Sequence, residues 1–342
     1  MSIYVLAAII SRPWFAHRVD TGDRKKIYIT VYIMLALSFS GYAAAATALA
    51  FFLTRFIQGL IWGGMTTSGP TMAVDIIPPA RRGEGLGFFG MTMTLGMCLG
   101  PVIGLQVYQQ YGFYVITWSS LLLCLAGAGI ASLIRVPGSP VQEPVYETPK
   151  KVLDRLVLRV GIPLAVNVMI ATFSYGVVAV YSALYGEMHG FKYAALMGLG
   201  MLVSRFMVGR QIDRGRVAEL SVISLSILTV SFGALALAPL EWIYYASAIL
   251  IGFGFGIFIP TFQTMKLNMA DRGHRGAVNS TFFTAFDIGV GTGMFLGGKI
   301  YAYLNLNWAF GTGALLNLLA IVYFYRISLD HYRKNKLGVD SD

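Results

Sequence analysis

The sequence has few charged residues and only two cysteines. Charged residues are 12% of the 342 residues, whereas a soluble domain carries about 25%. Both Cys98 and Cys124 lie inside apolar stretches, which excludes a disulfide framework and a cysteine metal site. No phosphate loop, catalytic triad spacing or cluster of metal ligands is present. We therefore expect no enzyme, no cofactor, no metal and no nucleic-acid partner.

Long apolar stretches fill the chain instead. Ten of eleven apolar blocks are long enough to cross about 30 Å of hydrocarbon as helices, and the first is not. Their Leu, Ala, Gly and Met content favours helices over barrel strands, and the 39 glycines suit closely packed membrane helices. The sequence predicts an all-α membrane protein. The blocks are approximately 1–13, 26–45, 49–76, 85–107, 113–134, 157–186, 193–210, 218–238, 242–268, 276–301 and 306–326.

The net charge of +10 is placed asymmetrically along the chain. Of the 26 Lys and Arg residues, all but Arg55, Lys192 and Lys299 fall on one side of the predicted membrane. This is the positive-inside pattern, so we expect these loops and the C-terminus to be cytoplasmic in an inner (plasma) membrane. The basic segments are 12–26, 81–82, 135–159, 205–216, 266–275 and 326–336.

The chain repeats itself at an offset of 193 residues without a gap. Ser11 falls on Ser204, Asp20 on Asp213 and Gly63 on Gly256. Both copies have their basic loops on the same side, which predicts two parallel bundles related by an axis along the membrane normal. We expect an N-terminal bundle at 1–134, a Pro-rich cytoplasmic linker at 135–155, a C-terminal bundle at 156–328 and a tail at 329–342.

The first repeat is shorter at its start than the second. The second half begins near Leu156, which has no counterpart in the first half. One interpretation is a twelve-helix protein that lacks its first helix and part of its second. The alternative is a protein with eleven segments.

Equivalent basic turns end the second helix of each half. Asp20 and Asp213 are each placed to cap the N-terminus of a neighbouring helix, and nearby Arg and Lys residues to pair with acids such as Asp75. This predicts a latch that opens when the halves move; the alternative is a pair of solvated loops. The gating candidates are Arg12, Asp20, Gly22, Arg24, Asp75, Arg205, Gly209, Asp213 and Arg214.

These turns resemble the loop signature of the major facilitator superfamily of secondary transporters. Asp20, Gly22 and Arg24-Lys25-Lys26 follow it, although Ala16 replaces the opening Gly and Thr21 an Arg. The resemblance continues at Arg55-x-x-Gln58-Gly59 and at the antiporter-like Gly96-x-x-x-Gly100-Pro101-x-x-Gly104. It implies two six-helix bundles and a monomeric multi-pass transporter of a small-molecule substrate. For the Gly-Pro helix it implies a seal that favours export, beside the simpler role of helix packing.

The resemblance also implies a substrate cavity between the first, fourth, seventh and tenth helices of the family. The first of these helices is absent from this sequence. On the other three, the candidates are Trp62, Asn167, Tyr175, Phe255 and Gln263, whose aromatic and amide groups suit an amphipathic molecule.

Asp287 and Arg55 are the candidates for proton coupling. If a helix begins at Gly276, Asp287 lies about 16 Å along it, near mid-membrane. A carboxylate there is costly unless it has a function, so proton binding is one interpretation and an Asp satisfied by Thr284 or water is the other. Arg55 either faces the bundle interior or extends to the outer interface. The resemblance implies proton coupling or contact with an anionic substrate for this Arg.

Three functional hypotheses follow. The first is proton-coupled efflux of a small organic molecule by alternating access. The second is an uptake symporter or facilitator of the same fold, and the third is a truncated membrane fragment that transports nothing. The substrate is not given by the sequence.

Overall fold

The structure, a computed structural model, describes residues 2–78, 81–136, 159–185, 190–237, 240–270 and 272–337. These ranges are helical and contain no strand, so the predicted all-α class is confirmed. Among them, seven helices are long and apolar enough to cross a membrane. Most of the predicted linker 135–155 and the end of the predicted tail 329–342 lie outside the described residues.

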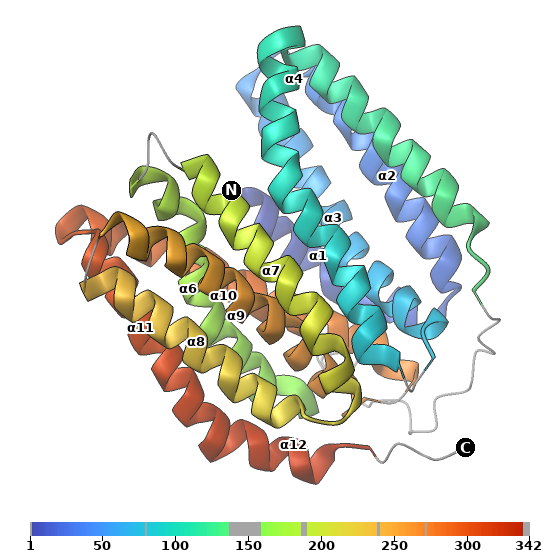
Figure 1. Ribbon diagram of the computed structural model, residues 1–342. Coiled ribbons are helices and arrows are strands. Elements are labelled where there is room, and N and C mark those ends of the chain that lie inside the picture. The colour runs from blue at the N-terminus through green and yellow to red at the C-terminus, as the bar shows by residue number, and fades with distance from the viewer. Residues whose placement is uncertain are drawn as a thin grey trace. The chain divides into compact units, whose positions relative to one another are not determined.

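The first three helices are joined by tight turns (Figure 1). They are α1 (Ser2–Thr21), α2 (Arg24–Ala44) and α3 (Ala48–Ile76). Asp23 caps α2 and Thr47 caps α3, each through its side-chain oxygen. Helix α1 runs well beyond the apolar block 1–13, because Ala8, Ala16 and Val19 form one continuous buried face.

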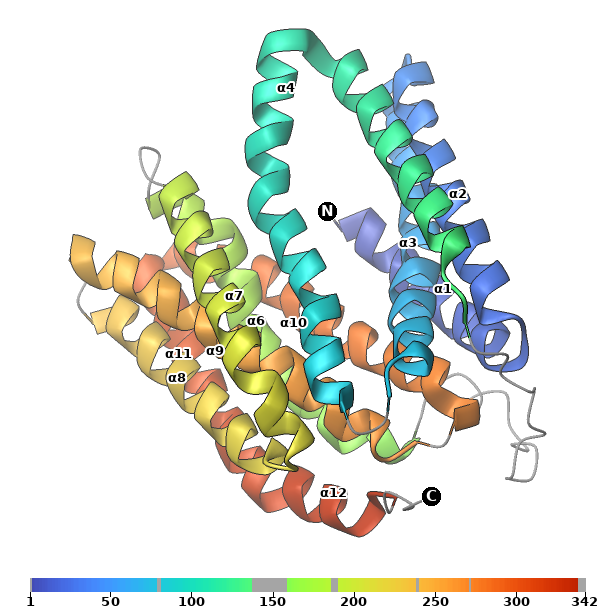
Figure 2. The ribbon, with the colours of Figure 1, turned by 45° about the vertical axis from the view of Figure 1, so that its right-hand side comes forward.

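Helix α4 (Arg82–Leu133) is two helices joined at a glycine. Gly112 has φ 81° and ψ −177°, a conformation that side chains with a Cβ rarely adopt. The chain reverses there (Figure 2), which agrees with the separate apolar blocks predicted at 85–107 and 113–134.

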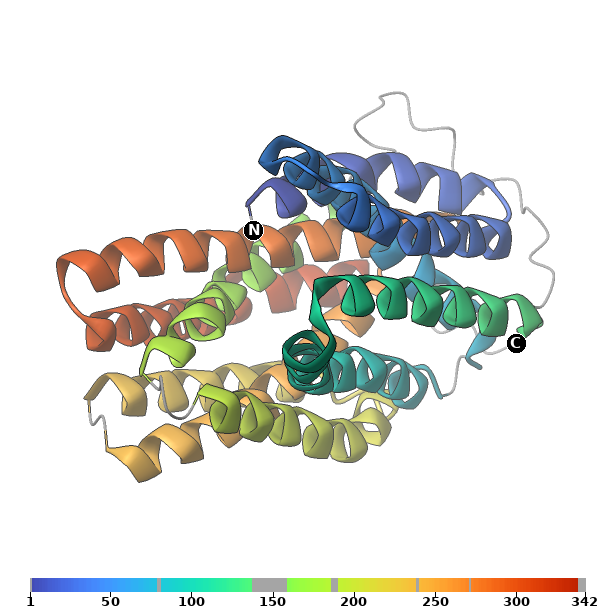
Figure 3. The same ribbon diagram turned by 90° about the horizontal axis from the view of Figure 1, so that it is seen from above.

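The remaining helices follow the predicted blocks closely. A short turn η2 (Arg159–Gly161) leads into α6 (Ile162–Tyr185), and η3 (Arg272–His274) precedes α10. Helices α8 and α9 run side by side as a hairpin (Figure 3). The bounds of the others are α7 (Gly190–Asp213), α8 (Val217–Leu237), α9 (Glu241–Leu267), α10 (Arg275–Tyr303), α11 (Leu306–Tyr323), the π-helical turn η4 (Phe324–Ser328) and α12 (Leu329–Asn335).

The helices form two compact units, which differ from the two sequence repeats because each contains the start of one helix from the other repeat. The first unit contains residues 1–78 and 100–159 together with 271–284, the start of α10. The second contains 160–270 and 285–342 together with 79–99, the start of α4. Each unit therefore includes the first turns of a helix that belongs to the other repeat.

Equivalent glycines pack equivalent helices within the two units. A Cβ at Gly63 of α3 would overlap Ser11 Oγ of α1, and a Cβ at Gly256 of α9 would overlap Ser204 Oγ of α7. Only glycine allows each pair of backbones to approach so closely. The ungapped repeat found in the sequence is thus repeated in the packing.

Candidate functional site

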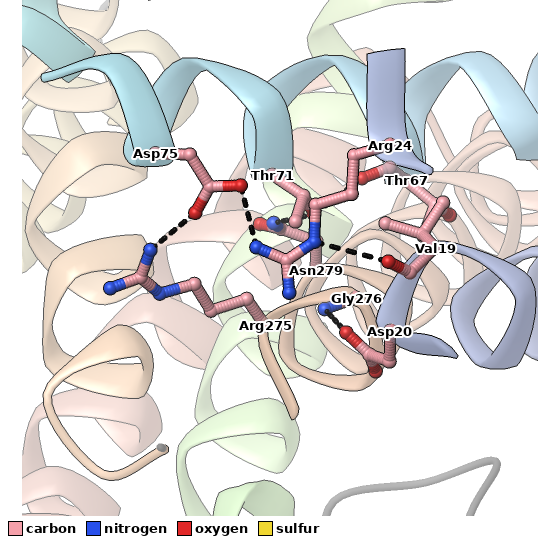
Figure 4. A network of polar contacts seen from close by, with 9 residues as sticks. All are labelled: Val19, Asp20, Arg24, Thr67, Thr71, Asp75, Arg275, Gly276 and Asn279. Atoms are coloured by element: carbon pink, nitrogen blue, oxygen red, sulfur yellow. Dashed lines mark hydrogen bonds and ion pairs between the residues drawn. The ribbon is translucent and has the colours of Figure 1, made fainter. Parts of the chain in front are cut away.

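The first feature of the candidate site is the capping of α10 by Asp20. The Asp20 carboxylate accepts hydrogen bonds from the backbone N–H groups of Gly276 at 2.7 Å and Ala277 at 3.0 Å (Figure 4). A Cβ at Gly276 would lie 2.8 Å from the carbonyl oxygen of Ala16, so this approach requires glycine. The cap predicted for Asp20 is therefore confirmed as a contact.

Asp75, at the end of α3, joins two arginines. Its Oδ2 accepts from Arg24 Nη1 and its Oδ1 from Arg275 Nη1, both at 2.5 Å (Figure 4). The side chains of Asp75, Arg24 and Arg275 are 7%, 11% and 9% exposed, so the ion pairs are largely shielded from water. Arg24 Nε also donates to the carbonyl oxygen of Val19 at 3.1 Å. The pairing of Asp75 with basic residues agrees with the sequence prediction.

A buried amide completes this group. Asn279 Nδ2 of α10 donates to Thr71 Oγ1 of α3 at 2.9 Å, and neither side chain is exposed (Figure 4). We call Asp20, Thr71, Asp75, Arg24, Arg275 and Asn279 the Asp20 network. Sequence reasoning missed Asn279, because nothing in the local pattern relates two polar residues more than 200 positions apart.

Burial changes the acidity of Asp20, which lies next to the turn that follows α1. Removal of the carboxyl group from water raises the pKa of Asp20 from 3.8 to about 7. The two backbone hydrogen bonds, Arg24 and His274 act in the opposite direction, since each favours the carboxylate. Asp20 therefore changes charge near neutral pH.

The second repeat contains the same cap without the same ion pairs. Asp213 at the end of α7 accepts from the N–H groups of Gly83 at 2.5 Å and Glu84 at 3.0 Å, at the start of α4. Gly209 packs against this turn, since a Cβ there would lie 2.8 Å from Glu84 Cα. Asn268 replaces Asp75 at the equivalent position, and its Nδ2 donates to Tyr332 Oη at 3.1 Å. We call Asp213, Gly83, Glu84, Asn268 and Tyr332 the Asp213 network.

The other gating candidates fall near these networks. Arg12 is buried, donates to Thr66 Oγ1 at 3.2 Å and lies over the Phe283 ring. Arg205, its equivalent in the repeat, is buried against Gly90, the counterpart of Phe283. Gly22 is the turn residue whose N–H donates to the carbonyl oxygen of Arg18 at 2.9 Å, and Arg214 is exposed.

Arg55 faces the interior of the first unit. Its Nη1 donates to Gln58 Oε1 at 3.0 Å and to Tyr42 Oη at 3.4 Å, and its guanidinium lies 4.6 Å from the centre of the Tyr4 ring. Tyr42 Oη in turn donates to Gln58 Oε1 at 2.7 Å. Tyr4, Tyr42 and Arg55 come from α1, α2 and α3, so Arg55 is held among three helices by neutral partners.

Asp287 lies on α10 next to an aromatic group of the second unit. The ring of its neighbour Phe286 is 5.8 Å from that of Tyr175, which packs edge-on against Phe255 at 5.0 Å. Asp287 is half-buried, and the group joins α6, α9 and α10. Two of the predicted cavity residues, Tyr175 and Phe255, are therefore brought together, and Tyr175 also packs against the residue that precedes Asp287.

The other cavity candidates are not part of that group. Asn167 is fully buried and donates to the carbonyl oxygen of Ala320, so its amide joins α6 to α11. Trp62 belongs to the first unit and packs near Tyr4, with ring centres 6.3 Å apart. Gln263 is buried in α9. Their contact with substrate stays a prediction.

The Gly-Pro segment of α4 differs from its repeat in α10. A Cβ at Gly96 or Gly100 would meet no atom of the described residues within 4 Å, and one at Gly104 would lie 3.5 Å from Ile116. The equivalent Gly289 instead seats α10 on α6, since a Cβ there would overlap Thr172 Oγ1. Pro101 lies within α4.

Comparisons with known proteins converge on one family. The family described as Major Facilitator Superfamily matches residues 1–289 and, in a second match, 193–341. The chain is 21% identical to the staphylopine export protein of Staphylococcus aureus, over 95% of this chain and 86% of that protein. It is 24% identical to the multidrug resistance protein MdtG of Serratia proteamaculans, over 94% and 81%.

Solved structures give the same fold. The outward conformation of the transporter FucP has a TM-score of 0.79 at 14% identity, covering 98% of this chain and 89% of that one. The human organic anion transporter MFSD10 has a TM-score of 0.77 at 16% identity, covering 94% and 82%.

Proposed function

This chain belongs to the major facilitator superfamily and is a multi-pass membrane transporter rather than an enzyme, and we propose that it exports a small organic molecule in exchange for protons. Two of its relatives carry names that refer to export or drug resistance. Like other members of such families, it would alternate access to a midplane site by movement of its two repeats. We place it as a monomer in the plasma membrane, with the basic loops in the cytoplasm.

The Asp20 network is the observation that supports alternating access, the central part of this proposal. It ties the start of α10, in the second repeat, to α1 and α3 in the first, through a helix cap, two ion pairs and a buried amide. If the repeats move relative to one another during transport, these bonds are present in one conformation of the transport cycle and broken in the other. The network is therefore the latch of the state in which the cytoplasmic side is closed.

Asp287 is the proposed proton carrier. A half-buried carboxyl within a membrane helix is stable as the neutral acid, or as a carboxylate that has a partner. Binding of a proton converts the second state into the first. Tyr175 and Phe255 are the proposed contacts for the apolar part of the substrate; they pack against each other, and Tyr175 also packs against Phe286, the residue before Asp287. Arg55, in the first unit, is proposed to assist proton coupling or to contact anionic groups.

Transport in proteoliposomes tests the proposal. A panel of labelled organic compounds is screened for counterflow first, and the compound with the strongest signal becomes the reporter substrate. With an imposed pH gradient, we expect Asp287→Asn to lose gradient-driven transport while it retains counterflow. Full gradient-driven transport by this variant would overturn the assignment of Asp287. Movement of substrate in the same direction as protons would show that the protein is a symporter and not an exporter.

A further inference from the structure

We propose that the outer face of the C-terminal segment Tyr325–Leu337 is a docking surface for the headgroup phosphates of anionic lipids. The segment comprises most of η4, all of α12 and the two residues that follow. The placement of this segment at the cytoplasmic leaflet rests on the proposed function. The binding of anionic lipid to the segment does not.

The inner face of the segment is fixed to the second unit by four hydrogen bonds. Ser328 Oγ donates to the carbonyl oxygen of Pro163 at 3.3 Å, and His331 Nε2 lies 2.7 Å from that of Val160. Tyr332 Oη accepts from Asn268 Nδ2, and the Leu337 N–H donates to the Asn268 carbonyl oxygen at 2.8 Å. These contacts hold the segment across the ends of α6 and α9, so its opposite face has a set orientation.

That opposite face is basic and exposed. It contains four basic side chains and one acid, Asp330, which pairs with Lys334 at 2.7 Å. The other three form no ion pair among the residues that the structure describes. Arg326 and Arg333 are seven residues apart and share one side of the helix. The basic residues are Arg326, Arg333, Lys334 and Lys336.

The depth of the segment matches the headgroup layer. Helix α11 has 18 residues, which span about 27 Å and so nearly cross the hydrocarbon. The chain turns at η4 and α12 runs along the base of the unit (Figures 1 and 2). The basic residues therefore begin where the hydrocarbon ends.

Exposed apolar side chains distinguish this surface from a site for a soluble anion. Tyr325 is 56% exposed, Ile327 44% and Leu337 45%, and each is next to a basic residue in the sequence. A helix that presents both kinds of side chain lies in the membrane interface, where acyl chains and phosphates are both within reach. Lys and Arg at that level are attracted to anionic lipid.

The test is a thermal unfolding series on the purified full chain in detergent, with phosphatidylglycerol or phosphatidylcholine added. We expect phosphatidylglycerol to raise the Tm of the wild type and phosphatidylcholine to raise it less. In the variant R326Q/R333Q/K336Q, the rise in Tm caused by phosphatidylglycerol should fall to roughly half or less. The rise caused by phosphatidylcholine should be unchanged. The control R135Q/R210Q/R216Q removes three exposed arginines elsewhere and should respond like the wild type.

Three results would overturn the proposal. One is an equal phosphatidylglycerol shift in wild type and R326Q/R333Q/K336Q. Another is an equal loss in the control variant, which would mean that total charge and not this face attracts the lipid. The third is full reproduction of the shift by inorganic phosphate or by an acidic peptide. Since no transport is measured, failure here leaves the proposed exporter function untouched, and failure of export leaves this result untouched.

Discussion

The two networks have the same helix cap and differ in everything around it. In the Asp20 network, Asp75 forms ion pairs with two arginines in a shielded site, and Asn279 adds a buried hydrogen bond. In the Asp213 network, Asn268 occupies the position of Asp75 and binds the C-terminal segment instead. The repeat has therefore kept the geometry of the cap and changed the charge, so the charged latch that we propose is confined to the first copy among the residues that the structure describes.

Removal of Asp75 is expected to have the largest effect. Asp75→Asn removes the carboxylate that Arg24 and Arg275 both contact in a site shielded from water, at a cost of about 3–5 kcal/mol. We expect a large fall in Tm in detergent and loss of transport. The matched change Asn268→Ala should cost far less, since it removes only the neutral hydrogen bond to Tyr332. Similar losses from both variants would contradict the contrast between the networks.

Alanine at equivalent glycines should have the next largest effect. Gly289→Ala forces a methyl group into Thr172 and Met169, an overpacking that costs about 1–3 kcal/mol. Gly96→Ala, its counterpart in α4, meets open space among the described residues and should change stability by about 0.5 kcal/mol or less. Paired denaturation curves check this. A strong effect of Gly96→Ala would reveal a packing partner for α4.

The Asp20 cap is expected to make stability depend on pH. The pKa of Asp20 is raised by burial, so the folded state holds a proton between pH 3.8 and about 7 that the unfolded state has released. This contribution to stability is complete below pH 3.8 and is lost as pH rises to about 7. We expect Asp20→Asn to flatten the fall in Tm across this window. An unchanged pH profile in Asp20→Asn would refute the assignment.

Loss of the C-terminal contact is the smallest effect. Tyr332→Phe removes the hydrogen bond to Asn268 and should cost about 1 kcal/mol. Denaturation of the full chain checks this, with Tyr325→Phe on the exposed face as the control. A loss well above that of one neutral hydrogen bond would mean that Tyr332 carries more of the second unit than its contacts indicate.

The sequence predicted the helices, the caps and the pairing of Asp75 with basic residues, and it missed two other tertiary contacts. The apolar blocks and the basic turns are local patterns, so they located the helices and placed Asp20, Asp213 and Asp75 correctly. Asn279 meets Thr71, and Tyr332 meets Asn268, through tertiary packing that leaves no periodic signal. Helix α1 also exceeded its apolar block, because burial of small residues such as Ala16 extends a helix without raising its hydropathy.

The opening of the latch is tested most directly by a reversible cross-link. The double variant Thr71→Cys/Asn279→Cys, with Cys98 and Cys124 replaced by Ser, places a cysteine pair across the Asp20 network. We predict that oxidation stops transport of the reporter substrate and that a reductant restores it. The control Ser174→Cys/Asn317→Cys, a contact within the second repeat, should transport in both states. Full transport by cross-linked Thr71→Cys/Asn279→Cys would show that these residues need not separate, and would contradict the latch.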